Sequence, residues 1–328
     1  MRLMLWLMAV AAVLYGGFWV VGSRAVLTGT NAALAGLKAE GRGDFGTVSL
    51  SGFPSRFDLR IETPSLQSTD GLVAWQAPFL QIYALSYKPN HIITVFPSTQ
   101  TVTLASQALN IASMDSRASI VLGIGADLPV DHAQMVSEKV SIASDMGWSA
   151  NLAVARLAIR QDKTEANGQE IGIELFGIDL LDTPAVLMAG SAPPPMRIDR
   201  ARLDATLSLD GPINRFTPQD GIGIQTVDIR ALELDWGKVR LRGEGTLVID
   251  AAGQPEGRID LRVTDWRKVM TAATDLGLVR TEFAKTAENA LAQLALASGD
   301  AETLEMPLKF SAGRASLGPF PLGPAPQF

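Results

Sequence analysis

The amino-terminal residues constrain this chain more than any other segment. Leu3 to Ser23 (LMLWLMAVAAVLYGGFWVVGS) is a run of 21 residues without a charge, between Arg2 and Arg24. As a helix, such a run spans roughly 30 Å, the thickness of the hydrocarbon core of a bilayer. A cleaved signal peptide usually has a shorter apolar region of about 7–15 residues and then an A-x-A-like site, and no convincing site follows here. The sequence therefore favours an uncleaved transmembrane anchor over residues 1–23, with a cleaved signal peptide as the alternative.

Charges on the two sides of the span leave its orientation open. Arg2 and the amino terminus favour a cytoplasmic start, but Arg24 and Lys38 follow the span. A two-residue tail is too short to hold a function, so the rest of the chain is the working part. We expect a single-pass protein of the bacterial inner membrane with its main domain in the periplasm. The absence of cysteine from the sequence fits an oxidising periplasm, and it fits many cytosolic proteins as well.

A juxtamembrane helix and a linker are expected over residues 24–45. Ala25 to Glu40 is rich in alanine and leucine, and Gly41-Arg42-Gly43 is suited to end a helix. The β-rich domain is then expected over residues 46–328.

After this linker, apolar residues recur at every second position, the period of a strand. Phe57, Leu59 and Ile61 alternate with charged residues, as in a half-buried strand. The break at Gly52-Phe53-Pro54 precedes this strand. Proline has no N–H to donate to the hydrogen bonds of a sheet, and glycine can adopt a positive φ. We therefore expect a corner of a sheet here, with Phe53 tucked into the core.

Strand patterns continue as far as a proline-rich connector. They lie at Leu72–Trp75, Phe79–Tyr87, His91–Phe96, Thr101–Leu104, Ala118–Ile124, Lys139–Ile142, Ser149–Ile159 and Glu170–Ile178, with turn-forming residues between most of them. A short helix is expected at Thr183–Gly190. Pro193-Pro194-Pro195 then forms a stiff connector, and we place a candidate subdomain boundary near 191–196.

Beyond the connector the alternation becomes more regular. Strands are expected at Arg197–Leu209, Val227–Trp236, Lys238–Asp250 and Arg258–Thr264, then helices at Asp265–Gly277 and Arg280–Ser298, and last a hairpin about Ala312-Gly313 with a Pro/Gly tail. In the meander, Val239, Leu241, Leu247 and Ile249 share one face, and the glycines between them suggest a bend or a close approach of another strand. Strands joined by short turns favour an antiparallel, mainly β (α+β) fold.

No constellation of catalytic or metal-binding residues stands out. The histidines are His91, at the start of a strand, and His132, in PVDHAQM, which we interpret as a loop or turn. There is no G-x-S-x-G elbow and no cysteine. Asp179–Asp182 and Asp199–Asp204 lack the spacing of a calcium loop, and pairing on a solvent-exposed face explains their charges. The glycine-rich pieces at 123–127 and 221–225 do not match a phosphate-binding turn. We therefore assign no catalytic, cofactor or metal residues, and no nucleic-acid site.

Apolar residues abound even where strands should face water, as in LQIYALSY and NLAVARLAI. Two packed layers with a full core explain them. A curved sheet with an apolar concave face, suited to an acyl chain or an apolar partner, explains them as well.

Several motifs resemble the bacterial DUF2125 proteins, a family of uncharacterised function. They are YGGFWVVGSRAV, VSLSGFPSRFDL, LDWGKVRLRGEGTLVIDAAGQPEGRIDLRVTDW and LKFSAGRASLGPFPLGPAP. The carboxyl-terminal half is also similar to AsmA-type envelope proteins. These resemblances imply an inner-membrane anchor, a periplasmic β-rich body and a role in envelope integrity or lipid handling.

We accordingly expect a non-enzymatic envelope protein, held in the inner membrane by its amino-terminal helix and contacting phospholipid along an apolar sheet face. One alternative is a scaffold or assembly factor that binds a periplasmic protein through a strand edge. Another is a periplasmic hydrolase that uses His91 or His132.

Overall fold

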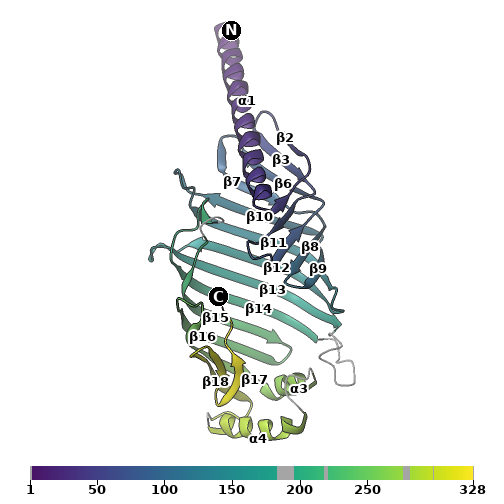
Figure 1. Cartoon of the computed structure of the whole chain (residues 1–328), viewed down its shortest axis with the longest axis vertical. Coiled ribbons are helices and arrows are strands. Elements are labelled where there is room, and N and C mark those ends of the chain that lie inside the picture. The colour runs from purple at the N-terminus through teal and green to yellow at the C-terminus, as the bar shows by residue number, and fades with distance from the viewer. Residues whose placement is uncertain (1, 183–195, 218–220, 276–280, 298, 328) are drawn as a thin grey trace.

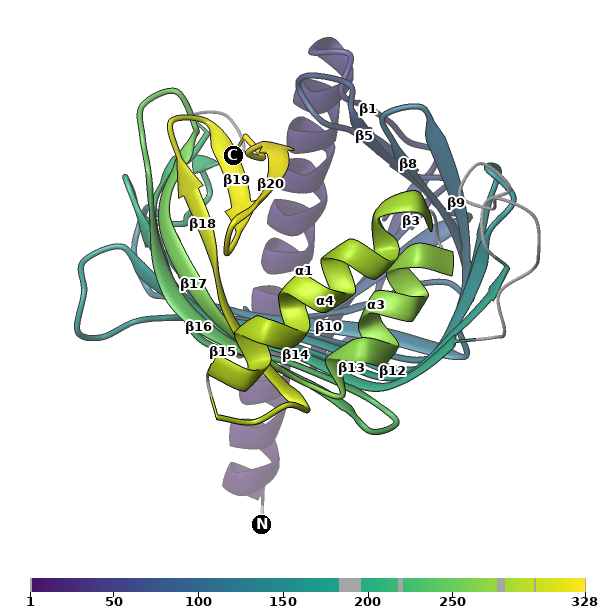
Figure 2. The ribbon, with the colours of Figure 1, turned by 90° about the horizontal axis from the view of Figure 1, so that it is seen from below.

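The computed structural model of the chain describes residues 2–182, 196–217, 221–275, 281–297 and 299–327. Its strands form one antiparallel sheet, which bends around the long axis of the molecule into a half-pipe (Figures 1 and 2). A long helix, α1 (Arg2–Ala39), runs from beyond one end of the sheet onto its concave side. Two shorter helices, α3 (Trp266–Asp275) and α4 (Thr281–Ala297), lie on the concave side at the other end. The mainly β fold predicted from the sequence is therefore confirmed.

Twenty strands of the described residues contribute to the sheet. The first ten are β1 (Gly43–Asp44), β2 (Val48–Ser51), β3 (Arg56–Glu62), β4 (Ser65–Gln67), β5 (Val73–Gln76), β6 (Phe79–Leu85), β7 (Lys88–Val95), β8 (Thr99–Leu104), β9 (Gln107–Ala112) and β10 (Asp115–Leu122). The longer strands follow as β11 (Val130–Ser144), β12 (Ser149–Gln161), β13 (Gly168–Asp182), β14 (Met196–Leu209), β15 (Ile224–Trp236), β16 (Val239–Ile249), β17 (Pro255–Thr264), β18 (Thr303–Ser311), β19 (Arg314–Leu317) and β20 (Phe320–Pro324).

The sheet forks at β11. The first half of β11 pairs with β10, and its last residues, Ser141 to Ser144, pair with β9. Lys139 lies between the two pairings with a φ of +48°, and the ladder to β12 is interrupted at this residue without a shift of register. One branch continues from β10 through β7, β6 and β3 to β2, and the other from β9 through β8, β5 and β4 to β1. His132, which the sequence placed in a loop, lies inside β11, because the strand is much longer than the predicted Lys139–Ile142.

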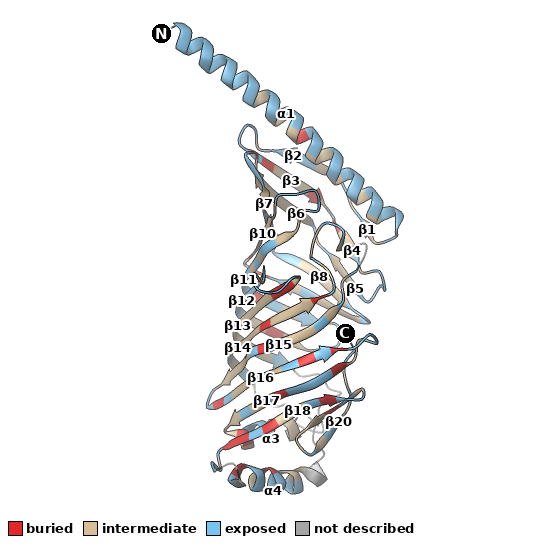
Figure 3. Cartoon of the chain, turned by 90° about the vertical axis from the view of Figure 1, so that its left-hand side faces the viewer, coloured by how far each residue is buried: buried red, intermediate tan, exposed pale blue. Residues whose placement is uncertain are grey.

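The predicted anchor and the predicted juxtamembrane helix form one continuous helix. Its first turns project beyond the sheet, and its carboxyl-terminal part lies beside β2 and β1 (Figure 3). The helix ends at the expected glycine: Gly41 has a φ of +70°, and the N–H of Arg42 donates to the carbonyl of Leu37 at 2.8 Å. This is the bonding pattern of a Schellman cap.

The break at Gly52 is a corner, as predicted, but the position expected for Phe53 is wrong. The Phe53-Pro54 bond is cis, and Gly52 has a φ of +102°. Phe53 is 62% exposed and packs edge to face on Trp19 of α1, with ring centroids 5.3 Å apart. Phe57 takes the buried place instead, at 5% exposure. The reason is that the alternation of β3 points Phe57 inward, whereas Phe53 belongs to the turn and lies outside that register.

Buried apolar clusters lie toward the carboxyl-terminal end. One gathers Ile229, Leu247, Ile259, Phe310 and Ala315 beneath the β18–β20 segment. The other joins α3 and α4 to β18. The two helices, the final hairpin and the face-sharing residues of β16 agree with the sequence prediction. The expected helix at 183–190 lies outside the described residues, as does the boundary near 191–196 apart from the first residue of β14.

Candidate functional site

The register of the sheet collects apolar side chains on one face. Residues directly opposite each other on antiparallel strands share a face, so the pairing can be followed across the sheet. Two rows run from β3 through β6, β7 and β10 to β18. The first row consists of Phe57, Ala84, Ile92, Ile120, Ala133, Ile159, Ile171, Ala205, Ile229, Gly245, Ile259 and Leu308. The second row consists of Leu59, Ile82, Thr94, Ala118, Met135, Leu157, Ile173, Leu203, Leu232, Gly243, Leu261 and Met306.

The two rows occupy the concave side of the half-pipe. At one end, Phe57 packs against α1, where a Cβ added to Gly22 would stand 2.9 Å from its ring. At the other end, Met306 belongs to the cluster of α3 and α4. Helices α3 and α4 lie inside the curve of the sheet, and the carboxyl-terminal half of α1 extends to its open side (Figure 2). No residue of either row carries a charge, so an uncharged face extends from the amino-terminal helix to the carboxyl-terminal helices.

The middle of this face lacks the second layer that covers its ends. Leu157 on β12 is 42% exposed, and its neighbours Met135, Ile159, Ile171 and Ile173 are only half-buried. None of these belongs to either buried cluster. Leaving apolar area in water costs about 25 cal/mol per Å², and contiguous apolar patches mark interaction sites. We therefore take the middle of the concave face, over β11–β14, as the candidate site.

The opposite, convex face is charged. Arg200 lies between Glu174, at 3.0 Å, and Glu233, at 3.6 Å. Arg242 pairs with Asp235 at 2.8 Å. These pairs link neighbouring strands on a solvated surface, where each contributes about 0–1 kcal/mol. These ion pairs keep the convex face hydrated. The concave face is therefore the side of the sheet that favours apolar molecules.

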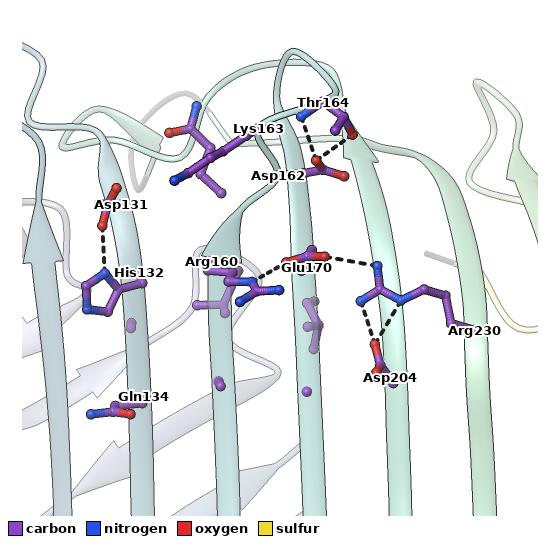
Figure 4. A pocket seen from close by; sticks show the side chains of 16 residues that line it. Asp131, His132, Gln134, Arg160, Asp162, Lys163, Thr164, Glu170, Asp204 and Arg230 are labelled. Atoms are coloured by element: carbon purple, nitrogen blue, oxygen red, sulfur yellow. Dashed lines mark hydrogen bonds and ion pairs between the residues drawn. The ribbon is translucent and has the colours of Figure 1, made fainter.

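A polar depression of about 810 Å³ lies on this convex face (Figure 4). Arg230 donates to Asp204 at 2.5 Å and to Glu170 at 3.1 Å, and Arg160 also binds Glu170. The hydrogen bond from Arg160 lowers the pKa of Glu170, and the hydrogen bond to Asp204 raises the pKa of Arg230. These charged groups satisfy one another, and Lys163 also lines the depression.

The two histidines do not form a catalytic triad with the described residues. The Nε2 of His91 lies 2.9 Å from the Oγ of Ser119. The Nδ1 of His132 lies 2.6 Å from a carboxylate oxygen of Asp131 (Figure 4). A triad needs one histidine in contact with both a nucleophile and an orienting acid. Among the described residues, His91 contacts a hydroxyl, that of Ser119, without an acid, and His132 contacts an acid, Asp131, without a nucleophile.

The aspartates considered for calcium are engaged elsewhere. Asp179 pairs with Arg197, Asp204 pairs with Arg230, and Asp199 accepts a hydrogen bond from the N–H of Gly237. Among the described residues, no group of three or more histidine, aspartate or glutamate side chains is placed to hold a metal ion. The glycine-rich pieces at 123–127 and 221–225 lead into strands rather than into a helix.

Sequence reasoning weighed an apolar concave face but could not locate it. The signal was present in the alternation of NLAVARLAI and in GQEIGIELF of β13. What was missing was the register that aligns those residues across neighbouring strands.

The fold and the site define a class of protein: a curved antiparallel sheet with an apolar concave face, preceded by one helix that is long and apolar enough to cross a membrane. The chain belongs to the DUF2125 family, described as an uncharacterized protein conserved in bacteria, whose family model matches residues 19–326. No curated protein and no solved structure matches the chain.

Proposed function

We propose that this protein is anchored in the bacterial inner membrane by α1, that its body lies in the periplasm, and that its concave face holds phospholipid acyl chains. The observation that carries the proposal is the pair of uncharged rows, which begin beside α1 and stay open over β11–β14. The expected likeness to AsmA-type envelope proteins, a family associated with lipid handling, points the same way. On this proposal the protein acts by binding and not by catalysis.

The chemistry of the site suits an acyl chain. Such a chain is long, flexible and apolar, and its burial is favourable by about 0.8 kcal/mol per CH₂ without any directional contact. Aliphatic side chains on a sheet face provide a continuous surface of the same kind. A headgroup at either rim can stay in water, so the charge of the lipid need not be buried.

The test uses the full chain in native-like membranes with a photoactivatable phospholipid, followed by peptide mapping of the adducts. Adducts on β12 and β13 are expected, besides those on α1 that any membrane anchor gives. The matched variants are Leu157→Glu on the concave face and Val136→Glu on the convex face, whose wild-type side chains are 42% and 37% exposed. Val136 lies opposite Arg156, which can pair with the new carboxylate.

Loss of the β12–β13 adducts in Leu157→Glu, with retention in Val136→Glu, is the expected result. Adducts confined to α1 in the wild-type protein would contradict the proposal. A protein that carries no phospholipid but captures one stoichiometric periplasmic partner would support the scaffold role instead.

A further inference from the structure

The sheet contacts α1 inside the apolar run of the helix. The hydroxyl of Tyr15 lies 3.0 Å from the Oγ of Ser86, a buried residue of the turn between β6 and β7. The indole N–H of Trp19 donates to the carbonyl of Arg56, at the start of β3, at 2.7 Å. Both contacting residues of α1 lie within the uncharged stretch of residues 3–23. The body therefore reaches the helix before the helix has left its apolar segment.

The part of α1 that precedes these contacts is too short to cross a bilayer alone. Residues 2–14 of a helix span about 20 Å, at about 1.5 Å per residue. The hydrocarbon core is about 30 Å thick and needs about 20 helical residues. A transmembrane α1 must therefore include Tyr15 and Trp19 in its spanning segment, and the parts of the body that touch them must lie in the membrane near its surface. Tilting the helix only increases the length required.

We propose that two turns of the body, at residues 52–55 and 86–87, dock with the adjoining start of β7 into the headgroup layer of the bilayer that α1 spans. We call them the anchor-side turns. Both lie where the helix leaves the sheet, near β2, β3, β6 and β7 (Figure 3).

The side chains of the anchor-side turns suit this layer. Phe53 is 62% exposed and Tyr87 is 69% exposed, although both are large aromatic residues. Trp19 packs on Phe53, which extends the aromatic group onto the helix. Tryptophan and tyrosine are enriched at membrane interfaces, where their apolar rings and polar tips each find a suitable environment, and the apolar ring of Phe53 adds to this group. Lys88 is exposed in the same region and is available to lipid phosphates.

Docking places the start of the concave face at the membrane surface. Phe57, the first residue of one apolar row, lies against α1 at Gly22, one turn beyond Trp19. A molecule that leaves the bilayer along the helix thus meets the apolar rows directly. The docking inference rests on the proposed membrane anchor and goes beyond the proposed lipid binding.

The test places a depth-sensitive fluorophore on single cysteines, since the natural chain has none. The variants are Phe53→Cys, Tyr87→Cys and Lys88→Cys, of which the last keeps both aromatic side chains. The matched control is Met146→Cys, in the turn between β11 and β12, where the wild-type side chain is 59% exposed. Met8→Cys, inside the apolar run, reports insertion of the helix. Each labelled full chain is reconstituted in vesicles of phosphatidylethanolamine and phosphatidylglycerol that carry quenchers at the headgroup or at mid-bilayer.

Labels at 53, 87 and 88 are expected to lose most of their emission to the headgroup quencher and to shift to shorter wavelength, while the label at 146 stays unchanged. The label at position 8 is expected to respond to the mid-bilayer quencher. If the label at 8 responds but those at 53, 87 and 88 behave like the label at 146, the helix spans the membrane without docking and the inference is overturned. That outcome leaves the proposed lipid binding standing.

Discussion

Gly22 of α1 lies against the ring of Phe57 on β3, so closely that a Cβ on the glycine would stand 2.9 Å from Cζ of the ring. The same ring lies 6.1 Å from that of Trp19, between centroids. A glycine at this position lets the helix approach the first strand of the concave face. The contact is one of several that join α1 to the sheet.

Replacing Gly22 by valine should loosen this contact. The new side chain must displace Phe57, and overpacking of this kind costs about 1–3 kcal/mol. Gly17→Val is the matched control, since nothing lies within 4 Å of a Cβ at Gly17. Thermal unfolding of the full chain in detergent should show a lower midpoint for Gly22→Val than for Gly17→Val. Equal midpoints would mean that the helix does not pack on β3.

The close approach of the paired strands β16 and β17 should leave no room for a side chain at Gly245. A Cβ there would stand 2.2 Å from the carbonyl oxygen of Arg258, and a neighbouring backbone cannot yield cheaply. We expect Gly245→Ala to lower the free energy of unfolding by about 2–4 kcal/mol. Gly172→Ala on β13 meets nothing within 4 Å and should change it by less than about 0.5 kcal/mol. Denaturant titration measures both, and similar values would refute the close approach.

Stability should fall in acid partly through Glu170. The hydrogen bond from Arg160 holds the pKa of Glu170 below its usual value of 4.5. A carboxyl group with a depressed folded-state pKa stabilises the fold above its unfolded-state pKa, and this contribution is lost as the pH falls through the folded-state value. Glu170→Gln should therefore be less stable than wild type at neutral pH and lose less stability below about pH 4.5.

Glu244→Gln serves as the control for this pH dependence, because the structure gives Glu244 no ion pair with the described residues. Its stability should follow the wild-type curve. If Glu170→Gln also followed that curve, the Arg160–Glu170 contact would be irrelevant to stability.

The proposed periplasmic location can be tested with the Met146→Cys variant. Its thiol lies in an exposed turn of the body and should react with a membrane-impermeant maleimide in cells whose outer membrane alone has been opened. Met8→Cys, within the helix, should stay protected. A Met146→Cys thiol that reacts only after the inner membrane is broken would place the body in the cytoplasm.

Local patterns predicted the elements that local physics controls. An uncharged run of 21 residues forms a helix, and the glycine at 41 caps it. Strict alternation predicted the β16–β17 meander and put Val239 and Leu247 on one face, which their register confirms. These features follow from the helical and strand periods alone. Phe53 was assigned wrongly because a turn has no period from which burial can be inferred.

Only the tertiary structure decided how the strands combine. The fork at β11, marked by Lys139, and the pairing of β9 with Ser141–Ser144 depend on hydrogen bonds between residues far apart in sequence. The concave site depends on them too. The sequence determined that Leu157 follows Arg156 and that Ile173 precedes Glu174. The sheet decided that they lie opposite each other and face an open side. Alternation is a property of one strand, whereas register and curvature are set by all the strands at once.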